Sequence, residues 1–393
     1  MIGNDVVFVS GVRTAIGDFG GSLKDKTTSF LATEVVKAAV ERSTIDAQDF
    51  EHSIFGNVIP TDSQDTYLSR VAAVNAGLPE TAAALTVNRL CGSGLQAVIS
   101  AAQQIQLGHA EVVVAGGAES MTRAPYQLPT SRFGQKMGDG VMVDTLLNTL
   151  NCPFNRYHMG VTAENIATRF GISREQQDEF ALVSHQRAQA AIEAGLFKDQ
   201  IIPIDIGKRG KVKLFEQDEH VRFDNTLEDL QKLRPAFQKE GTVTAGNASG
   251  INDAAAAIVM TSGQQAKERG VATLGRLVDY TVTGVSPEIM GIGPVPAITT
   301  LLERNNLSAN DIDVYEVNEA FAAQAMAVVQ ELNLPIEKVN PNGSGISLGH
   351  PVGATGAIIT VKALHELQRV DGRYAMVSLC IGGGQGIAAL IER

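Results

Sequence analysis

The sequence has 393 residues, of which 44% are hydrophobic and 19% are charged, so it is long enough for two or three domains with a large core. Its formal net charge of −11 argues against a nucleic acid or an anionic membrane as the main partner, because both favour a basic protein surface. Three cysteines are too few for a disulfide framework, and neither a Cys-x-x-Cys motif nor a His-x-x-x-His cluster indicates a metal site.

The sequence shows no sign of membrane insertion or export. No stretch approaches the roughly 18 consecutive apolar residues of a membrane-spanning helix. Asn4 and Asp5 lead directly into a strand-like segment, and neither end carries a visible targeting signal. We therefore expect a cytoplasmic protein with no membrane partner.

Short apolar strands alternate with helices along most of the chain. The pattern predicts strands at Val6–Ser10, Val112–Ala115, Leu274–Val278 and Ala375–Leu379. It predicts helices at Phe30–Arg42, Gly94–Leu107, Ala320–Leu332 and Thr355–Leu367. This alternation indicates an α/β fold with largely parallel sheets.

Two parts of the sequence repeat one pattern. Ser53–Asn57 is similar to Val314–Asn318, and at nearly the same offset Gly94 and Gly356 each precede a helix and a strand. The repeat predicts a duplicated domain. Between the two copies, residues 120–250 lose the alternation and contain the basic cluster 208–213, which indicates an insertion that covers the core and helps to bind a ligand.

The segment Asn88–Gly94 places a cysteine directly before an apolar helix. Partial positive charge and free N–H groups at a helix N-terminus favour a thiolate at Cys91, as a nucleophile requires. The adjacent glycines allow a substrate to approach the backbone closely, where the Cys91 N–H can help to hold an oxyanion. A buried structural cysteine explains the local sequence about equally well.

Two further glycine-rich segments contain a histidine and a second cysteine. Asn340–Gly356 places His350 before a helix, where a neutral imidazole can deprotonate Cys91. Ser378–Gly386 places Cys380 at the end of a strand, followed by backbone donors. Dinucleotide-binding loops are also glycine-rich, but here no helix with a ribose-binding acid follows.

A fourth segment, Glu316–Phe321, ends a predicted strand and opens a helix. Asn318 in this segment is a candidate site residue, although a simple helix cap explains it equally well. Each of the four segments is ambiguous when it is considered alone.

Together the four segments resemble the thiolase family along the whole chain, and Gly11–Gly17 and Gly116–Met121 extend the resemblance. The resemblance implies an α/β thiolase fold, in which a duplicated αβαβα layered core carries an inserted loop domain. The implied domains are an N-terminal half at 1–120 plus 251–270, a CoA-binding loop domain at 121–250, and a C-terminal half at 271–393.

The resemblance also implies a role for each catalytic group. Cys91 would be acylated after activation by His350, and Cys380 would move the α-proton of acetyl-CoA. Asn318 would orient a water in an oxyanion hole completed by His350, and the N–H groups of Cys91 and Gly382 would form a second hole. Such a set supplies a thiolate for acyl transfer and a stabilised enolate for the Claisen step without a metal.

The inserted domain would supply the contacts to coenzyme A. The implied contacts are Ser249 on the pantetheine arm, His158 and Met159 beside the acyl group, Phe237 and Phe321 along the tunnel, and Arg222 near the nucleotide, with Ala245 as a further CoA-binding residue in the motif that contains Ser249. The basic cluster 208–213 would meet the CoA phosphates. CoA is a substrate and product here, so no tightly bound cofactor is expected.

The implied enzyme is an acetyl-CoA C-acetyltransferase, which interconverts two acetyl-CoA with acetoacetyl-CoA and CoA through an acyl-cysteine. The sequence of the His350 segment is most similar to those of bacterial biosynthetic 3-ketothiolases, which implies short 3-ketoacyl-CoA as further substrates. The family resemblance also implies a homodimer or homotetramer. Asp229, Pro341 and Ser344 depart from the family pattern and leave the exact substrate preference open. The sequence also leaves the physiological direction of the reaction open.

Two other functions fit parts of the sequence. A decarboxylating ketoacyl synthase shares the duplication and the Cys nucleophile, but it would have a histidine in place of Asn318. A non-catalytic carrier of CoA would lack the set of reactive groups. Cys152 fits no motif and is expected to be a packed or loop residue, and structural or surface roles are expected for His52, His109, His185, His220 and His365.

Overall fold

The computed structural model describes residues 5–393, so Asn4 lies outside the described residues. One mixed sheet runs through the molecule in the order β13-β14-β15-β12-β1-β11-β5-β3-β4, with β2 beside β11 and β8 beside β1. Its strands are β1 (Val6–Thr14), β2 (Gly17–Asp18), β3 (His52–Gly56), β4 (Ala83–Val87), β5 (Val112–Ser120), β8 (Ile201–Ile202), β11 (Asn252–Ser262), β12 (Gly275–Gly284), β13 (Val314–Val317), β14 (Tyr374–Ile381) and β15 (Gln385–Glu392).

The predicted duplication is confirmed by the order of strand directions. In the N-terminal half, β1–β11 and β11–β5 are antiparallel, and β5–β3 and β3–β4 are parallel. In the C-terminal half, β12–β15 and β15–β14 are antiparallel and β14–β13 is parallel. Tyr315 completes the series with an isolated parallel bridge to Val339. The short antiparallel pairing of β1 with β12 joins the halves.

The expectation of largely parallel sheets is wrong, because the long pairings in the middle of each half are antiparallel. Only a tight turn separates β14 from β15, and strands joined by so short a turn pair in opposite directions. In the N-terminal half, the insertion returns the chain beside β5, so that β11 runs against it.

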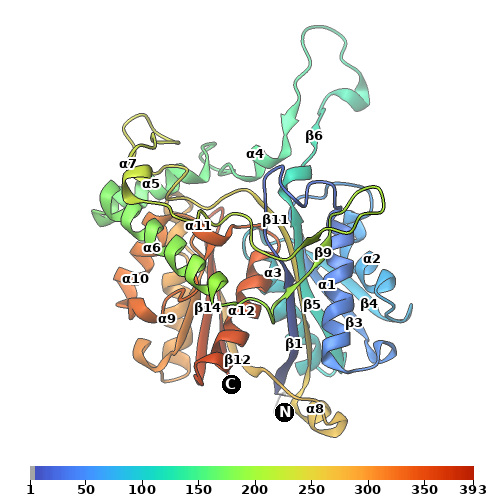
Figure 1. The fold of residues 1–393 in the computed structure, drawn as a ribbon. Coiled ribbons are helices and arrows are strands. Elements are labelled where there is room, and N and C mark those ends of the chain that lie inside the picture. Colours follow the sequence, from blue (N-terminus) through green and yellow to red (C-terminus); the bar gives the residue numbers. More distant parts are fainter. Residues whose placement is uncertain (1–4) are drawn as a thin grey trace.

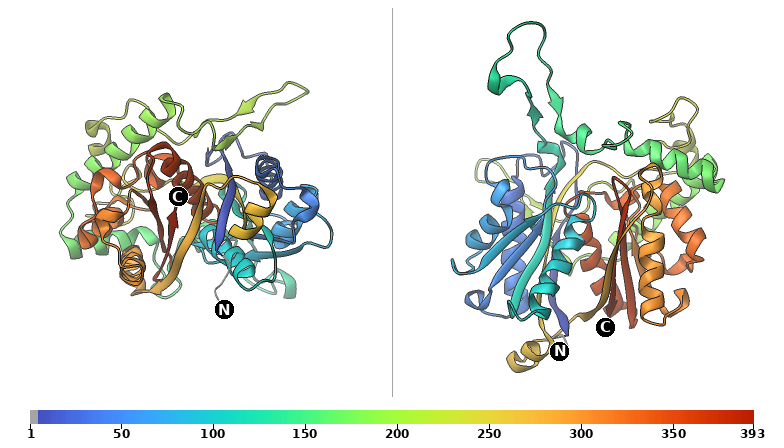
Figure 2. Two further views of the ribbon diagram at one scale, coloured as in Figure 1. Left: turned by 90° about the horizontal axis from the view of Figure 1, so that it is seen from below. Right: turned by 180° about the vertical axis from the view of Figure 1, so that it is seen from behind.

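Helices and sheet halves form five layers (Figures 1 and 2). The outer layers contain α1 (Thr28–Ser43) and α2 (Leu68–Asn75) on the N-terminal half, and α9 (Pro294–Arg304) and α10 (Ala322–Leu332) on the C-terminal half. The central layer contains α3 (Ser93–Gln106) and α12 (Thr355–Arg369), one from each half. The layered αβαβα fold and the predicted helices and strands are therefore all present.

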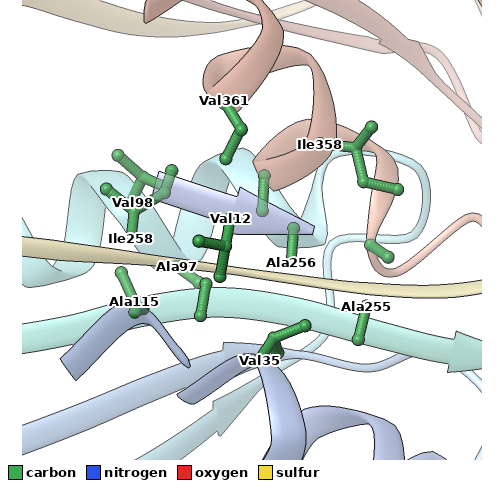
Figure 3. Packing of buried hydrophobic residues seen from close by; sticks show 14 of the residues in the cluster. Val12, Val35, Ala97, Val98, Ala115, Ala255, Ala256, Ile258, Ile358 and Val361 are labelled. Carbon is green, nitrogen blue, oxygen red and sulfur yellow. The ribbon is translucent and has the colours of Figure 1, made fainter. Parts of the chain in front are cut away.

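Small residues allow the central layer to pack closely. A Cβ placed on Gly356 of α12 would lie 2.2 Å from the Leu95 backbone nitrogen of α3, and one on Gly94 would lie 2.6 Å from the Ala357 nitrogen. Both distances are too short for a side chain, so glycine is needed at each crossing point. Figure 3 shows the buried core beside this crossing, where small and branched apolar residues such as Ala97, Ala256 and Val361 interlock.

Residues 121–250 cover one end of both halves (Figure 1). This insertion contains α4 (Thr145–Thr149), α5 (Met159–Phe170), α6 (Arg174–Glu193), α7 (Leu227–Gln231) and the short strands β6 (Tyr126–Gln127), β7 (Val143–Asp144), β9 (Ile204–Asp205) and β10 (Leu214–Phe215). The arm that contains β6 and β7 projects away from the body. The remaining helices are α8 (Gly263–Arg269) and α11 (Gly345–Leu348), besides single 3-10 turns.

Within residues 5–393, no helix combines the length and apolar character needed to cross a membrane. Over the same range, no group of His, Cys, Asp and Glu side chains is arranged to hold a metal ion.

Candidate active site

A cavity of about 380 Å³ lies between the two halves and the insertion. All the site residues named from the sequence except Asn318 line this cavity: Cys91, His158, Met159, Arg222, Phe237, Ala245, Ser249, Phe321, His350, Cys380 and Gly382. These residues come from loops that are far apart in the chain. The fold thus gathers the glycine-rich segments of both halves around one chamber of the size of a ligand pocket.

The turn that carries Cys91 is held by hydrogen bonds from its backbone to nearby side chains. Leu90 has a φ of 45°, a left-handed conformation that is unusual for a residue with a side chain. The Leu90 N–H donates to Asn88 Oδ1 at 2.9 Å, and the Arg89 N–H donates to Ser93 Oγ at 2.8 Å. These bonds fix the strained turn, which is a common feature of functional sites.

The Cys91 thiol is neutral at physiological pH. Burial raises the pKa of Cys91 to about 11, the nearby Glu119 carboxyl adds to the rise, and the backbone N–H groups of Gly382 and Cys91 oppose it. Backbone N–H groups favour the thiolate, as expected, but the loss of hydration on burial outweighs them. Cys91 must lose its proton as it reacts.

His350 lines the same cavity as Cys91 and is able to accept that proton. Burial lowers the pKa of His350 to about 4, so the ring is neutral. Its Nδ1 lies 2.7 Å from Thr355 Oγ1, and the Thr355 hydroxyl donates to the Pro351 carbonyl at 2.9 Å. Because that hydroxyl proton is already engaged, Nδ1 must be the donor and Nε2 carries the free lone pair.

Asn318 follows β13 and contacts the His350 ring, but it does not itself line the cavity. Its Nδ2 lies at nearly equal distances from the two ring nitrogens, 3.4 Å from Nε2 and 3.5 Å from Nδ1, so it contacts the ring without engaging the Nε2 lone pair. Its backbone N–H donates to the Ser378 carbonyl at 3.0 Å. The side chain is fully buried. Asn318 is therefore a polar partner of the histidine, and the N-cap of α10 is Phe321 instead.

Cys380 lies near the end of β14, and Gly382 is the first residue after this strand. Burial raises the pKa of Cys380 strongly, and the neighbouring Cys91 adds to the shift. A Cβ on Gly382 would lie 2.8 Å from Met159 Cε, so a larger residue would push the methionine out of place. Gly383 and Gly384 then turn the chain with φ values of 84° and 90°, which favour glycine.

Aromatic stacking shapes the wall contributed by the insertion. The His158 ring stacks on Phe237 with centroids 4.6 Å apart, and Phe237 meets Phe321 edge-on at 6.1 Å. His158 also caps α5, because its Nδ1 accepts the Gly160 N–H at 3.0 Å. Gly160 is needed there, since a Cβ would lie 2.2 Å from the Phe237 ring.

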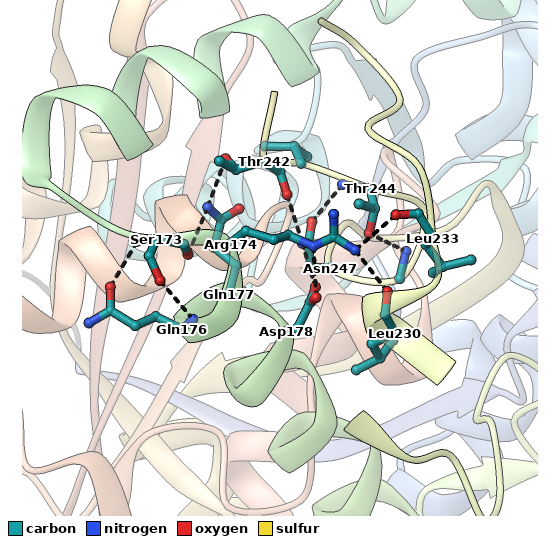
Figure 4. A network of polar contacts seen from close by, with 12 residues as sticks. Ser173, Arg174, Gln176, Gln177, Asp178, Leu230, Leu233, Thr242, Thr244 and Asn247 are labelled. Atoms are coloured by element: carbon teal, nitrogen blue, oxygen red, sulfur yellow. Dashed lines mark hydrogen bonds and ion pairs between the residues drawn. The ribbon is translucent and has the colours of Figure 1, made fainter. Parts of the chain in front are cut away.

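The loop that carries Ala245 and Ser249 is fixed by a polar network on α6 (Figure 4). The Asn247 amide donates to Asp178 at 2.9 Å, and Arg174 donates to the same carboxylate at 2.7 Å. On the other side, the Ser249 N–H donates to the Ala320 carbonyl at 2.9 Å. The loop therefore connects the insertion with the segment that contains Asn318.

The basic cluster 208–213 does not line the cavity. Lys208 instead forms an ion pair with Asp25 at 2.8 Å. The permanently charged cation at the cavity is Arg222, whose backbone N–H donates to His185 Nδ1 at 3.2 Å. Contact between the basic cluster and CoA phosphates stays a prediction.

Several lining residues were not named from the sequence as site residues. The apolar ones are Met121, Leu150, Ala236, Ala248, Gly250, Ile251, Met290, Ala320 and Val352. His220, expected to be structural or at the surface, also lines the cavity. Cys152 is fully buried outside the lining, as expected for a packed cysteine.

Comparison with known proteins identifies the family. The thiolase N-terminal domain matches residues 6–264, and the thiolase C-terminal domain matches residues 271–393. The chain belongs to the thiolase family. This thiolase is 62% identical to the beta-ketothiolase BktB of Cupriavidus necator over 99% of both chains. It is 50% identical to the acetyl-CoA acetyltransferase of Escherichia coli over 98% of both chains.

Solved thiolase structures have the same fold. The acetyl-CoA acetyltransferase of Bacillus anthracis superimposes with a TM-score of 0.97 at 49% identity, covering 100% of this chain and 99% of that one. Human mitochondrial 3-ketoacyl-CoA thiolase in complex with CoA superimposes with a TM-score of 0.96 at 46% identity, covering 99% and 98%.

Proposed function

We propose that this thiolase interconverts two acetyl-CoA with acetoacetyl-CoA and CoA, and that it also cleaves short 3-ketoacyl-CoA. The observation that carries the proposal is that Cys91, Cys380 and His350 line one cavity, which lies between the two halves and the insertion. The names of the relatives, acetyl-CoA acetyltransferase and beta-ketothiolase, support the same reaction.

In the first step, His350 Nε2 takes the proton of Cys91 while the sulfur attacks the thioester of acetyl-CoA. The neutral ring with a free lone pair on Nε2 is the form that this step needs. The developing oxyanion is stabilised by preorganised N–H donors, and CoA leaves with the proton held by His350. The product is an acetyl group on Cys91.

In the second step, Cys380 passes its thiol proton to the neutral His350 and, as a thiolate, removes the α-proton of a second acetyl-CoA. Asn318, through a bound water, and His350 stabilise the enolate oxygen, and the enolate carbon attacks the acetyl group on Cys91. The N–H groups of Cys91 and Gly382 face the sulfur and hold the tetrahedral oxyanion. Collapse of this intermediate breaks the bond from Cys91 sulfur to carbon and releases acetoacetyl-CoA, and His350 returns its proton to the sulfur to restore the Cys91 thiol.

The apolar chamber and the aromatic wall suit the pantetheine arm and a short acyl chain. Ser249 and Ala245 are proposed to contact the arm, and Arg222 the nucleotide. We further propose residues 121–250 as the CoA-binding loop domain between an N-terminal half (1–120 plus 251–270) and a C-terminal half (271–393). Location in the cytoplasm, and assembly as a homodimer or homotetramer, stay predictions.

The test of the proposal is thiolysis of a series of 3-ketoacyl-CoA thioesters by the purified protein. We expect acetoacetyl-CoA to be cleaved, with activity falling as the acyl chain outgrows the chamber. The control is the His350→Ala variant, which lacks the base. Absence of thiolysis on every member of the series by the folded wild-type protein would contradict the proposal.

A further inference from the structure

His220 is the polar side chain of the cavity for which the proposed reaction has no role. It comes from the insertion, two residues before Arg222, and its side chain is only 12% exposed. Its Nδ1 is hydrogen bonded to Asp18 Oδ1, in a partly exposed carboxylate of the N-terminal half. Because Asp18 engages Nδ1, Nε2 is the ring nitrogen that remains for a ligand in the cavity.

Three consecutive side chains, those of residues 218–220, connect the segment that carries His220 to residues 13–22. Asp218 forms a buried two-pronged ion pair with Arg13, at 2.7 and 2.9 Å. Glu219 accepts the Asp18 N–H at 3.0 Å and the Ser22 hydroxyl at 2.7 Å. These contacts join residues about 200 positions apart. They give a structural role to the segment around Gly11–Gly17, which takes no part in the proposed reaction.

Asp18 also reaches the catalytic histidine through one further residue. Strand β2 pairs with β11 so that Asp18 lies opposite Asn252. Asn252 Nδ2 donates to Asp18 Oδ1 at 3.3 Å and to the Gly17 carbonyl at 3.1 Å. Asn252 Oδ1 in turn accepts the His350 backbone N–H at 2.9 Å.

Two glycines provide the space for these contacts. A Cβ on Gly250 would lie 2.4 Å from His220 Cε1, and a Cβ on Gly349 would lie 2.5 Å from Asn252 Cγ. The φ of Gly349 is 108°, which side chains rarely adopt. Both links therefore depend on a glycine beside the site.

We propose that Asp18 and Asn252 are positioning residues that hold His220 against the acyl-CoA ligand and tie this contact to the backbone of His350. The hydrogen bond from His220, with the charges of His220 and Arg222, holds the pKa of Asp18 below its usual value, so Asp18 stays a charged acceptor. Such a bond is stronger than one between neutral groups. This proposal rests on the proposed function, because it takes CoA thioesters as the ligand.

The first test is substitution of each partner of the His220 contact. Loss of a charge-assisted hydrogen bond is expected to raise KM for acetyl-CoA about tenfold or more in Asp18→Asn and in His220→Ala, with a smaller change in kcat. Their effects should not multiply in the double variant, because both remove one contact. The matched control is Asp371→Asn, which removes a surface pair with Arg393 and should behave as wild type.

The His220→Asn variant is included in case His220→Ala fails to fold. Its amide can donate to Asp18 in place of Nδ1, but it offers no group in place of Nε2. We expect its KM to rise as in His220→Ala. Asn252→Ala should instead lower kcat more than it raises KM, since the His350 backbone loses its acceptor. A wild-type kcat in Asn252→Ala would contradict the link to His350.

The deciding measurement is CoA affinity by titration calorimetry, which does not require turnover. Weaker binding in both Asp18→Asn and His220→Asn, with melting temperatures close to wild type, would support the proposal. Wild-type affinity in either variant, or effects that multiply in the double variant, would overturn it. If the wild-type protein bound CoA without catalysing thiolysis, the proposed function would be contradicted. The calorimetric test of the His220 contact would still be valid, because it depends on binding alone.

Discussion

The reacting groups are neutral before the substrate binds. Burial raises the pKa of Cys91 to about 11 and lowers the pKa of His350 to about 4, so neither group carries a charge near pH 7. A separated charge on either would lie in a poorly hydrated chamber, where it is costly. Proton transfer and attack on the thioester are therefore expected to occur together.

This protonation state predicts how iodoacetamide inactivation depends on pH. Only the thiolate reacts, so the rate of Cys91 alkylation should rise about tenfold per pH unit from pH 7 to 9, because its pKa lies above this range. His350 is neutral throughout the same range and does not contribute a step. Prior addition of an acyl-CoA should protect. A rate that levels off below pH 8 would show that Cys91 is a thiolate near neutrality.

The two cysteines should be separable by half-reaction. In Cys380→Ser the hydroxyl is a much weaker acid than a thiol, so condensation should slow about 100- to 10,000-fold, as is typical for loss of a general base. Acetyl-CoA/CoA exchange should survive much better, because Cys91 and His350 suffice for it. Equal loss of both rates in a folded variant, checked by circular dichroism, would mean that Cys380 also serves acylation.

The sequence reveals those site residues that stand in short motifs of their own. Cys91, His350 and Cys380 each lie in a glycine-rich segment that is visible locally. His220 shows no such signal, because its role depends on Asp18, which lies 202 positions away. The extent to which burial raises the Cys91 pKa could not be predicted either, because burial of the thiol is a tertiary effect.

Among the secondary structure elements, the central helices α3 and α12 place the two loops of the site next to each other. Cys91 lies just before α3, and His350 just before α12. Their close crossing at Gly94 and Gly356 thus sets the distance between nucleophile and base.

Substitution of Gly356 by alanine tests this crossing. The new Cβ would lie 2.2 Å from the Leu95 backbone nitrogen, so we expect a loss of stability of about 1–3 kcal/mol and lower activity. The control is Gly140→Ala, where no atom lies within 4 Å of the added carbon. Free energies of unfolding from urea titrations would measure the effect. Equal stability of the two variants would show that the helices can separate at little cost.

The existence of helices and strands could be predicted from hydrophobic periodicity, but the strand directions could not. The segments of β5 and β14 have the apolar character of buried strands in either orientation. The direction of β11 follows from how the insertion returns the chain, which local sequence does not encode.

The whole molecule is a duplicated core whose two halves contribute different groups to one site. The N-terminal half supplies Cys91, and the C-terminal half supplies Asn318, His350 and Cys380. Asn57, the counterpart of Asn318, instead binds the buried Glu119 at 3.1 Å. The repeat was visible in the sequence, whereas this division of roles appears only in the fold.

Assembly into a homodimer or homotetramer is predicted from the family. The projecting arm exposes large apolar side chains, with Phe133 87% and Met137 91% exposed, as expected for a contact surface. Light scattering should find a dimer or tetramer, and Phe133→Ser with Met137→Ser should weaken any contact that the arm makes. A fully active monomer would contradict this prediction.

The most direct test of the central claim is mass spectrometry of the protein after brief mixing with acetyl-CoA. The account predicts an acetyl adduct on Cys91 of the wild-type protein, the same adduct in Cys380→Ser, and none in Cys91→Ala with its fold intact. An adduct found only on Cys380 or Cys152 would contradict the assignment of Cys91 as the nucleophile.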